Sequence, residues 1–239
     1  MKQKTETKWD EYFALRGIDA SAYRNEALSK YFKAILPASR SARICDIGCG
    51  FGQTLRALRV LGYRNLVGIE PSEAAAEFCQ SDNLPVRRVD VQGAIESGIG
   101  RFDFVYMMHV LEHVKKDEIV PLLIKIRTEM LAPSGVFFVA VPNAQSHTAA
   151  YWRYEDWTHE TLFTAGSLAY VLRDAGFRSV EIYDADCMID ARWLWRFPKR
   201  VLLGYYRLRY RFWNWVTASS THKGGCSVFS YEVKAVAHD

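Results

Sequence analysis

Seven residues near the start of the chain combine one acid with three glycines. They read Asp46-Ile-Gly-Cys-Gly-Phe-Gly52 and stand between a short, mostly apolar run and a segment with helical spacing. Glycine lets the backbone turn sharply and approach a ligand closely, because no Cβ stands in the way. A dinucleotide-binding turn reads G-x-G-x-x-G and leaves room for a pyrophosphate. Here a carboxylate precedes the first glycine by two residues; it would repel a pyrophosphate and suits a cationic or amine-bearing ligand.

Two further acids follow later apolar segments. Glu70 ends the segment 65–70, and a carboxylate about 20 residues past a glycine turn can accept both ribose hydroxyls. Asp90 stands between two valines. The glycine turn, Glu70 and Asp90, in this order and context, resemble the cofactor site of the class I S-adenosylmethionine (SAM)-dependent methyltransferases. The resemblance covers residues 40–185 and the last strand. It implies an α/β, Rossmann-like fold with a seven-stranded, mostly parallel sheet whose last strand is antiparallel.

The resemblance also implies which residues bind SAM. In that family the glycine turn meets the methionine end, the acid after the second strand holds the ribose, and an acid after the third strand meets the adenine. The residues assigned to the cofactor in this way are Asp46, Gly48, Cys49, Gly50, Gly52, Glu70, Pro71, Asp90, Val91 and Met108. A nucleotide-binding Rossmann domain with an extra glycine is the alternative, and Glu70 argues against it.

Two histidines are candidates for a catalytic base. Methyl transfer from a sulfonium to oxygen is an in-line displacement, and a hydroxyl attacks better once a base with a pKa near the operating pH takes its proton. His113 closes the stretch His109-Val-Leu-Glu112-His113, which resembles the family's H-x-L-E-H at the start of a helix beside the substrate. His159 lies in the aromatic, polar segment 151–159. The sequence does not choose between them, and a hydrogen-bonded structural role is the alternative for either.

The same stretch raises the question of a metal. On a helix, His109, Glu112 and His113 would share one face, because they are three and four residues apart. In two related branches of the family that this chain resembles, the ubiquinone-pathway and the small-RNA 2′-O-methyltransferases, an E-x-x-E-H stretch holds a divalent cation, but here His109 replaces the first Glu. Together with His159, these side chains suit a borderline metal better than magnesium. We predict no metal requirement, so that EDTA leaves methylation intact.

Alternating strand and helix signals place these motifs in a parallel sheet covered on both faces. The predicted strands are 42–46, 65–70, 85–89, 102–107, 135–141 and 178–184, and the predicted helices are 53–61, 72–80, 117–131 and 167–175. The last strand, 227–237, is expected to return antiparallel between strands five and six. Residues 8–36 carry apolar side chains at helical spacing. They either cap the cofactor or pack on the sheet without touching it.

The composition predicts one cytoplasmic domain. The chain has 239 residues, of which 49% are hydrophobic and 24% charged, as is ordinary for a globular domain. Its start is polar and lacks a secretory signal, and no apolar run approaches the roughly 20 residues that span a bilayer. The cysteines show no metal-type spacing and favour free thiols; they are Cys45, Cys49, Cys79, Cys187 and Cys226. DNA is not an expected partner, because residues 107–110 lack the Pro-Pro-aromatic motif of amino-directed DNA methyltransferases.

Residues 186–226 interrupt the last hairpin with a basic, aromatic segment. No Asp or Glu occurs between Ala191 and Tyr231, while Lys and Arg alternate with Trp, Tyr and Leu over 192–216. Three interpretations stay open: docking on the anionic inner face of the cytoplasmic membrane, nucleic-acid binding, and a lid or dimer face that packs its aromatics internally. The alternating Arg207, Arg209 and Arg211 are spaced as on a strand, so a clean amphipathic helix is not assured.

These features divide the chain into three parts: a helical cap (1–38), a SAM-binding core (39–185 and 227–239) and an insertion over the substrate side (186–226). The loop around Thr158, the Ala175-Gly-Phe turn and the basic insertion are similar to those of bacterial methyltransferases of surface-polysaccharide and glycolipid assembly. This resemblance implies a hydroxyl-bearing acceptor on a polysaccharide or lipid-linked glycan. A small phenolic or quinone-type acceptor and a non-catalytic, SAM-binding membrane protein are the alternatives.

Overall fold

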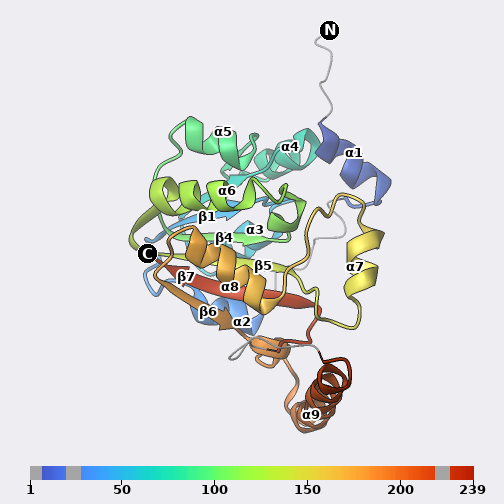
Figure 1. Cartoon of the computed structure of the whole chain (residues 1–239). Helices are drawn as coiled ribbons and strands as arrows, with labels where there is room; N and C mark the ends of the chain where they lie inside the picture. Colours follow the sequence, from blue (N-terminus) through green and yellow to red (C-terminus); the bar gives the residue numbers. More distant parts are fainter. Residues whose placement is uncertain (1–6, 20–27, 219–226) are drawn as a thin grey trace.

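A seven-stranded sheet forms the centre of the molecule, in the order β3-β2-β1-β4-β5-β7-β6 (Figure 1). The computed structural model describes residues 7–19, 28–218 and 227–239. The strands are β1 (Arg43–Ile47), β2 (Asn65–Ile69), β3 (Val86–Arg87), β4 (Phe102–Met108), β5 (Leu131–Pro142), β6 (Ser179–Tyr183) and β7 (Glu232–His238). Strand β7 runs antiparallel to β5 and β6, and the remaining pairs are parallel. The predicted α/β, Rossmann-like sheet is therefore confirmed.

Helices cover both faces of this sheet. They are α1 (Lys8–Leu15), α2 (Lys30–Ile35), α3 (Gln53–Val60), α4 (Glu73–Ser81), α5 (Val91–Glu96), α6 (Ile119–Lys125), α7 (Ala149–Glu155), α8 (Ala165–Asp174) and α9 (Trp193–Val216). One face is packed by α5, α6 and α8, with Leu123 and Leu168 in the buried cluster. The other face is packed by α2, α3 and α4, with Phe32 and Leu58 in the second cluster. Because both faces are covered, the central strands are almost continuously apolar.

Local signals in the sequence explain where several helices begin. Helix α4 starts at Ser72, whose side chain accepts a hydrogen bond from the backbone of Ala75. Helix α8 starts at Thr164 with a reciprocal capping box to Ser167. These hydroxyls satisfy backbone N–H groups that have no partner within the helix. Helix α3 instead starts at Gly52, whose backbone lies in the left-handed region with φ 75°.

Some predicted boundaries are wrong. The predicted last strand at 227–237 starts only at Glu232. The preceding residues form a loop, and the Asn143 amide donates to the backbone carbonyls of Val228 and Ser230 in it. The predicted helix 117–131 is α6 followed by a π-helical turn at Ile126–Met130, so β5 starts earlier than expected. The predicted strand 85–89 shortens to β3, because Asp90 caps the unpredicted six-residue helix α5.

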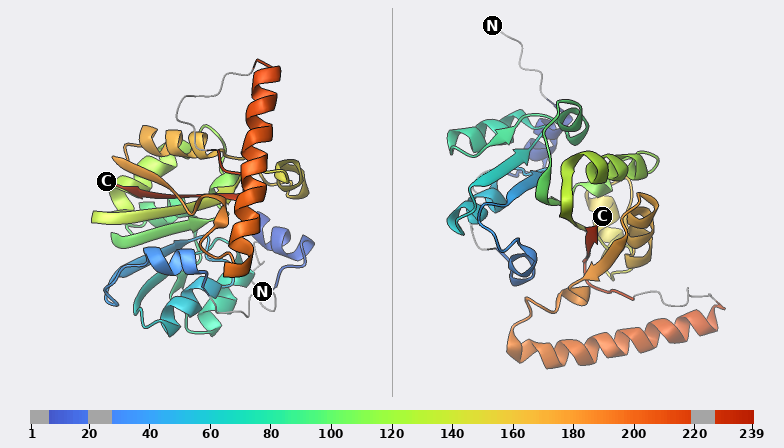
Figure 2. Two further views of the ribbon diagram at one scale, coloured as in Figure 1. Left: turned by 90° about the horizontal axis from the view of Figure 1, so that it is seen from below. Right: turned by 90° about the vertical axis from the view of Figure 1, so that its left-hand side faces the viewer.

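Most of the described insertion is one long helix, which follows the short 3₁₀ turn Ala185–Cys187. Helix α9 runs from Trp193 to Val216, so the strand-like alternation of Arg207, Arg209 and Arg211 does not reflect a strand. It stands beside the helix and sheet layers and does not join them (Figure 2). Within the described residues, α9 and the other helices are too short or too polar to cross a bilayer. Parts of the predicted cap and of the insertion lie outside the described residues: 1–6, 20–27 and 219–226, the last of which includes Cys226. The four cysteines within the described residues are free thiols.

Candidate active site

Two adjoining cavities lie where β1, β2 and β4 end. One has a volume of about 340 Å³ and the other about 620 Å³. Both are lined by Trp9 of α1, by Gly48 of the glycine turn, and by Pro71, Val110 and His113. The carboxyl edge of a parallel sheet is the place where α/β proteins bind ligands, because the loops there diverge. The shared wall makes the two cavities one binding region.

All but one of the residues that the sequence assigns to the cofactor line one of these cavities. The first cavity is lined by Asp46, Gly48, Cys49, Gly50, Glu70, Pro71 and Met108, and the second by Gly48, Pro71, Asp90 and Val91. Gly52 lines neither cavity. A Cβ at Gly52 would lie 2.4 Å from Cδ1 of Leu84, so this glycine permits close packing where α3 begins.

Glu70 is held in place by the glycine turn. Its Oε2 accepts a hydrogen bond from the backbone N–H of Gly50 at 2.8 Å, and its Oε1 accepts one from Ser72 at 2.9 Å. Burial raises the pKa of Glu70, while these two backbone donors oppose the shift. A carboxylate oxygen has more than one acceptor direction, so both oxygens can still receive ligand hydroxyls. Glu70 is thus a fixed double acceptor at the cavity wall.

Asp46 lies deeper and is almost completely buried. Burial raises the pKa of Asp46 to about 7, and the nearby charge of Glu70 adds to the shift. A buried carboxylate is stabilised in its charged form by a cation close to it. The site therefore favours a positively charged ligand group beside Asp46.

Helix α1 lies against the same cavity. Asp10 accepts hydrogen bonds from the Ser72 hydroxyl at 2.7 Å and from the backbone of Ala74 at 3.1 Å, which ties α1 to the start of α4. The rings of Trp9 and Tyr12 meet the His113 imidazole edge-on, with centroids 5.3 and 6.0 Å away. Of the two roles expected for this segment, α1 has the position of a cap.

His113 faces both cavities and is part of a hydrogen-bonded chain. It is the last residue of a short 3₁₀ turn, Leu111–His113. The helix expected to start at this point begins only at Ile119. Its Nδ1 lies 2.8 Å from Oγ1 of Thr158, and that hydroxyl donates to Oδ1 of Asp156 at 2.6 Å. Since the Thr158 proton is directed at Asp156, Thr158 accepts from Nδ1–H, which leaves Nε2 unprotonated. Burial lowers the pKa of His113, so the ring is neutral at pH 7.

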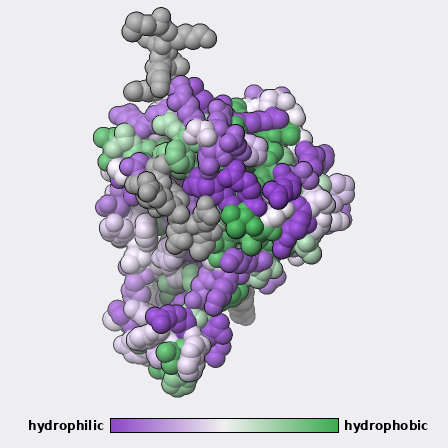
Figure 3. Space-filling view, turned by 180° about the vertical axis from the view of Figure 1, so that it is seen from behind, coloured by the Kyte–Doolittle hydropathy of each residue, from purple (hydrophilic) through white to green (hydrophobic). Residues whose placement is uncertain are grey.

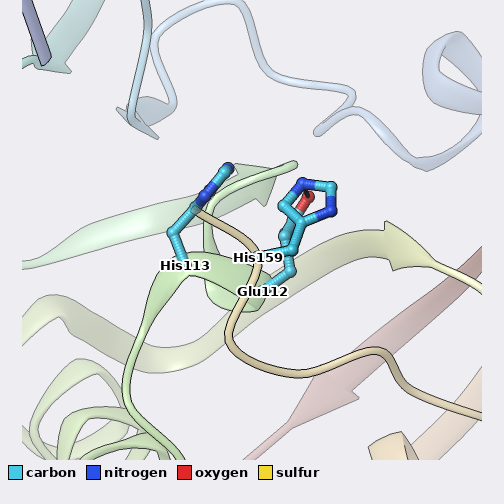
Figure 4. Close-up of side chains that lie close together, drawn as sticks. All are labelled: Glu112, His113 and His159. Atoms are coloured by element: carbon cyan, nitrogen blue, oxygen red, sulfur yellow. Dashed lines mark ion pairs between the residues drawn. The ribbon is translucent and has the colours of Figure 1, made fainter. Parts of the chain in front are cut away.

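His159 lies beside His113 (Figure 4) but lines neither cavity. It is 6% exposed, and the centroids of the two imidazoles are 4.8 Å apart. Its Nδ1 lies 2.6 Å from the carbonyl oxygen of Trp152, to which it donates. Its Nε2 lies 3.6 Å from Asp156 and 3.9 Å from Glu112. These contacts are those of a buried, hydrogen-bonded histidine that supports the loop.

His109, which the sequence suggested only as a possible metal ligand, forms a second charged centre. Its Nδ1 lies 3.4 Å from Oε1 of Glu112 and its Nε2 lies 3.3 Å from Oε2 of Glu232. Burial opposes protonation, but the two carboxylates raise the pKa of His109 to about 10. His109 is therefore an imidazolium at neutral pH. Glu232 also forms an ion pair with Lys234 at 2.9 Å. The sequence points to these two residues only through their charges, which stand out in an otherwise apolar strand.

One group of potential metal ligands lies close together in the part of the chain that the structure describes. It consists of Glu112, His113 and His159, whose ligand atoms all lie within 4.8 Å of one another (Figure 4). Glu112 is fully buried, and neither of its carboxylate oxygens has a hydrogen-bond partner. Two nitrogens and one oxygen fit a borderline divalent cation. The imidazolium of His109 already faces the same carboxylate, so a positive charge is present there without a metal.

The sheet order, the glycine turn and the acidic cavity together define a Rossmann-like α/β protein built to bind a nucleoside cofactor. A family model described as "Methyltransferase domain" matches residues 20–182. The chain belongs to the SAM-dependent methyltransferase family, and S-adenosylmethionine is the cofactor of that family.

Sequence relatives share part of the chain. Trans-aconitate 2-methyltransferase of Deinococcus radiodurans is 29% identical over 124 residues, which are 52% of this chain and 46% of that protein. A ubiquinone biosynthesis O-methyltransferase of Methylococcus capsulatus is 33% identical over 104 residues, 41% of this chain and 42% of that protein. This chain therefore covers less than half the length of either relative.

Solved structures share the fold over nearly the whole chain. A SAM-dependent methyltransferase from Archaeoglobus fulgidus superposes with a TM-score of 0.66 over 96% of this chain and 100% of that one, at 21% identity. Phosphoethanolamine N-methyltransferase 2 of Haemonchus contortus, in complex with SAM, gives a TM-score of 0.60 over 99% of this chain and 61% of that one, at 16% identity. At such identities the likeness establishes the fold.

Proposed function

We propose that the protein transfers the methyl group of SAM to a hydroxyl oxygen, with His113 as the general base. The observation that carries this proposal is the chain from His113 through Thr158 to Asp156. It leaves Nε2 unprotonated on a neutral histidine that lines both cavities. A base in this state accepts a proton at pH 7, whereas the imidazolium of His109 has no free position to do so.

The reaction needs few groups from the protein. SAM, when bound, would supply the methyl group from its positively charged sulfur and would leave as S-adenosylhomocysteine. Nε2 of His113 would take the proton that the acceptor hydroxyl loses. Asp156, acting through Thr158, stabilises the imidazolium that forms. Glu70 and Asp46 hold the ribose and the cationic end of SAM, and Asp90 and Val91 line the side assigned to the adenine. Helix α1 lines both cavities with Trp9, which reduces the space for water beside the reacting groups. His159 then has a supporting role.

For the acceptor we propose a sugar hydroxyl of a polysaccharide or of a lipid-linked glycan at the inner face of the cytoplasmic membrane. The insertion and the loop around Thr158 support this class. A small phenolic or quinone-type acceptor is the second candidate, and it is supported by the 33% identity to a ubiquinone biosynthesis O-methyltransferase. Both candidates present a hydroxyl group, so the same base serves either reaction.

Labelled SAM distinguishes these functions. The protein is incubated with methyl-tritiated SAM and either a butanol extract of lipid-linked glycans or a set of soluble phenols. We expect label in the glycan fraction, in a linkage that survives mild alkali, as an ether does and an ester does not. His113→Gln should abolish transfer without changing SAM affinity, and His159→Gln should retain most of it. SAM binding without transfer to either set would favour a non-catalytic protein, and label in phenols would favour the second candidate.

A further inference from the structure

We infer that α9 is a membrane-surface helix that lies flat on an anionic lipid bilayer with one defined face. This inference concerns a surface outside the cofactor cavities and does not depend on the proposed reaction. Helix α9 has 24 residues, and none of them is buried. A helix that packed its aromatic side chains internally would bury them, so the interpretation of α9 as an internally packed lid does not fit the structure.

Contacts with the body fix the orientation of α9. Lys199 donates to the carbonyl oxygen of Cys187 at 2.8 Å, and Arg207 pairs with the buried carboxylate of Asp186 at 2.8 Å. The ring of Tyr206 stacks near that of Phe229, with centroids 6.2 Å apart. Successive residues of a helix advance by about 100°, so Lys199, Tyr206 and Arg207 lie on one side. The opposite side faces away from the protein.

That opposite side is an apolar strip along the whole helix. Its members are three, four or seven residues apart, and each is between 52% and 78% exposed: Leu194, Phe197, Val201, Leu208, Phe212 and Trp215. This spacing puts them on one face of a helix. A continuous apolar strip on a protein surface marks an interaction site, because isolated domains rarely leave one open to water.

Cations border the strip and do not interrupt it. Arg200 and Arg211 follow one edge of the apolar face, and Arg209 lies at the other edge. No acid occurs anywhere between Ala191 and Tyr231. In the space-filling view, hydrophilic (purple) and hydrophobic (green) residues lie side by side on the projecting segment at the bottom (Figure 3). Such a helix inserts its apolar face at the acyl boundary, while the arginines reach anionic head groups.

The same arrangement suits a bilayer better than a nucleic acid. A nucleic acid would need cations at the centre of the exposed face to meet its phosphates. Here aliphatic side chains such as Val201 and Leu208 occupy the centre. The ring of Tyr206 also lies 4.3 Å from that of His147, in the loop between β5 and α7. The anchored side of α9 therefore also contacts the loop that leads through α7 to Thr158 and His159.

Vesicle flotation tests this inference with the full chain. The vesicles are phosphatidylcholine alone or phosphatidylcholine with about 30% phosphatidylglycerol, which supplies the anionic surface. We expect flotation with the anionic vesicles that weakens as salt rises, and much less with neutral ones. The doublet Phe197→Gln and Leu208→Gln should weaken binding about tenfold or more. Its matched control is Tyr170→Gln with Val60→Gln, two side chains that are 66% and 71% exposed on α8 and α3.

Charge is tested in the same way. Arg200→Gln with Arg211→Gln should weaken binding to anionic vesicles about tenfold, whereas Arg173→Gln with Arg178→Gln on another surface should not. SAM affinity verifies that each variant is folded, because no residue of α9 lines the cofactor cavities. The inference is overturned if wild type does not float, if it binds neutral and anionic vesicles alike, or if the α9 variants float normally. If the protein does not bind vesicles but forms dimers that the α9 variants lose, the partner of α9 is a second copy of the chain. If it instead binds RNA and the α9 variants do not, the partner is RNA. Methyl transfer is measured separately, so either proposal can fail alone.

Discussion

The Nε2 atom of His109 lies 3.3 Å from Oε2 of Glu232, which joins the loop after β4 to the first residue of β7. The two residues are far apart in the chain, and His109 reaches Glu232 from a left-handed backbone conformation with φ 55°. The other ring nitrogen faces the buried Glu112. One imidazolium therefore offsets two carboxylates at the edge of the cavity, and its charge ties the antiparallel strand to the site.

His109→Gln should lower the free energy of unfolding by about 2 kcal/mol. Removing one partner of a fully buried pair costs roughly 3–5 kcal/mol, and the cost is smaller here because 46% of the His109 side chain is exposed. The pKa of His109 is raised to about 10, so its contribution is complete below pH 6.5 and is lost as pH rises through 10. Urea denaturation from pH 6 to 10 should show the difference from wild type shrinking. A constant difference, or an equal effect of His238→Gln at the far end of β7, would contradict this account.

The rate of methyl transfer should report the titration of His113. Its pKa is lowered below 6.5 by burial, so activity should be constant near pH 7 and fall only at more acidic pH, as the base becomes protonated. The pH profile of kcat measures this, and the acidic limb should vanish together with the activity in His113→Gln. An acidic limb with a midpoint well above 6.5 would point to a different base.

Thr158→Val should reduce kcat about tenfold and leave SAM affinity unchanged. The change removes the hydroxyl that accepts from Nδ1 of His113 and donates to Asp156. A net hydrogen bond to a charged group contributes about 1.5 kcal/mol, which is roughly a factor of ten. Thr128→Val, whose hydroxyl donates to a surface carbonyl of Ile124, is the matched control and should behave as wild type. If both variants lose activity equally, Thr158 does not position the base.

Glu70→Ala should weaken SAM binding by roughly tenfold to a hundredfold or more. Each charge-assisted hydrogen bond to a ribose hydroxyl is worth about 1.5–3 kcal/mol, and the change also frees the backbone N–H groups of Gly50 and Ser72. Glu70→Gln keeps the shape and should lose less. Calorimetry with SAM and with S-adenosylhomocysteine measures both variants, and Glu77→Gln on the exposed side of α4 is the control. Unchanged affinity in Glu70→Ala would remove this residue from the site.

Treatment with EDTA should leave methyl transfer intact. The cluster of Glu112, His113 and His159 has the donors for a borderline cation, yet His109 already places a positive charge 3.4 Å from Glu112. The assay compares untreated protein, protein dialysed against EDTA, and dialysed protein with Mn²⁺ or Zn²⁺ restored. Loss of activity that either metal restores would show that these three residues form a metal centre.

Much of the fold could be predicted because its signals are local. Each parallel strand is a short apolar run followed by its own helix, and the Gly-rich turn after β1 marks such a boundary. The predictions that are wrong concern boundaries with competing local signals. Asp90 follows a strand pattern but caps α5, and Glu232 starts β7 late because Asn143 holds the preceding loop.

The sequence by itself determined the family and predicted residues that line the cavities, because the glycine turn, Glu70 and Asp90 act through spacing within single strand–turn–helix units. Only the tertiary structure placed one histidine on the cavity and the other behind it. The Thr158 hydroxyl that orients His113 is 45 residues away, and such a contact is set by how two loops pack. The tertiary structure likewise decided which side of α9 is exposed. The orientation of this helix depends on the bonds of Lys199 and Arg207 to Cys187 and Asp186, which precede it in the chain. Spacing along the chain fixes a helical face, but only packing decides what that face meets.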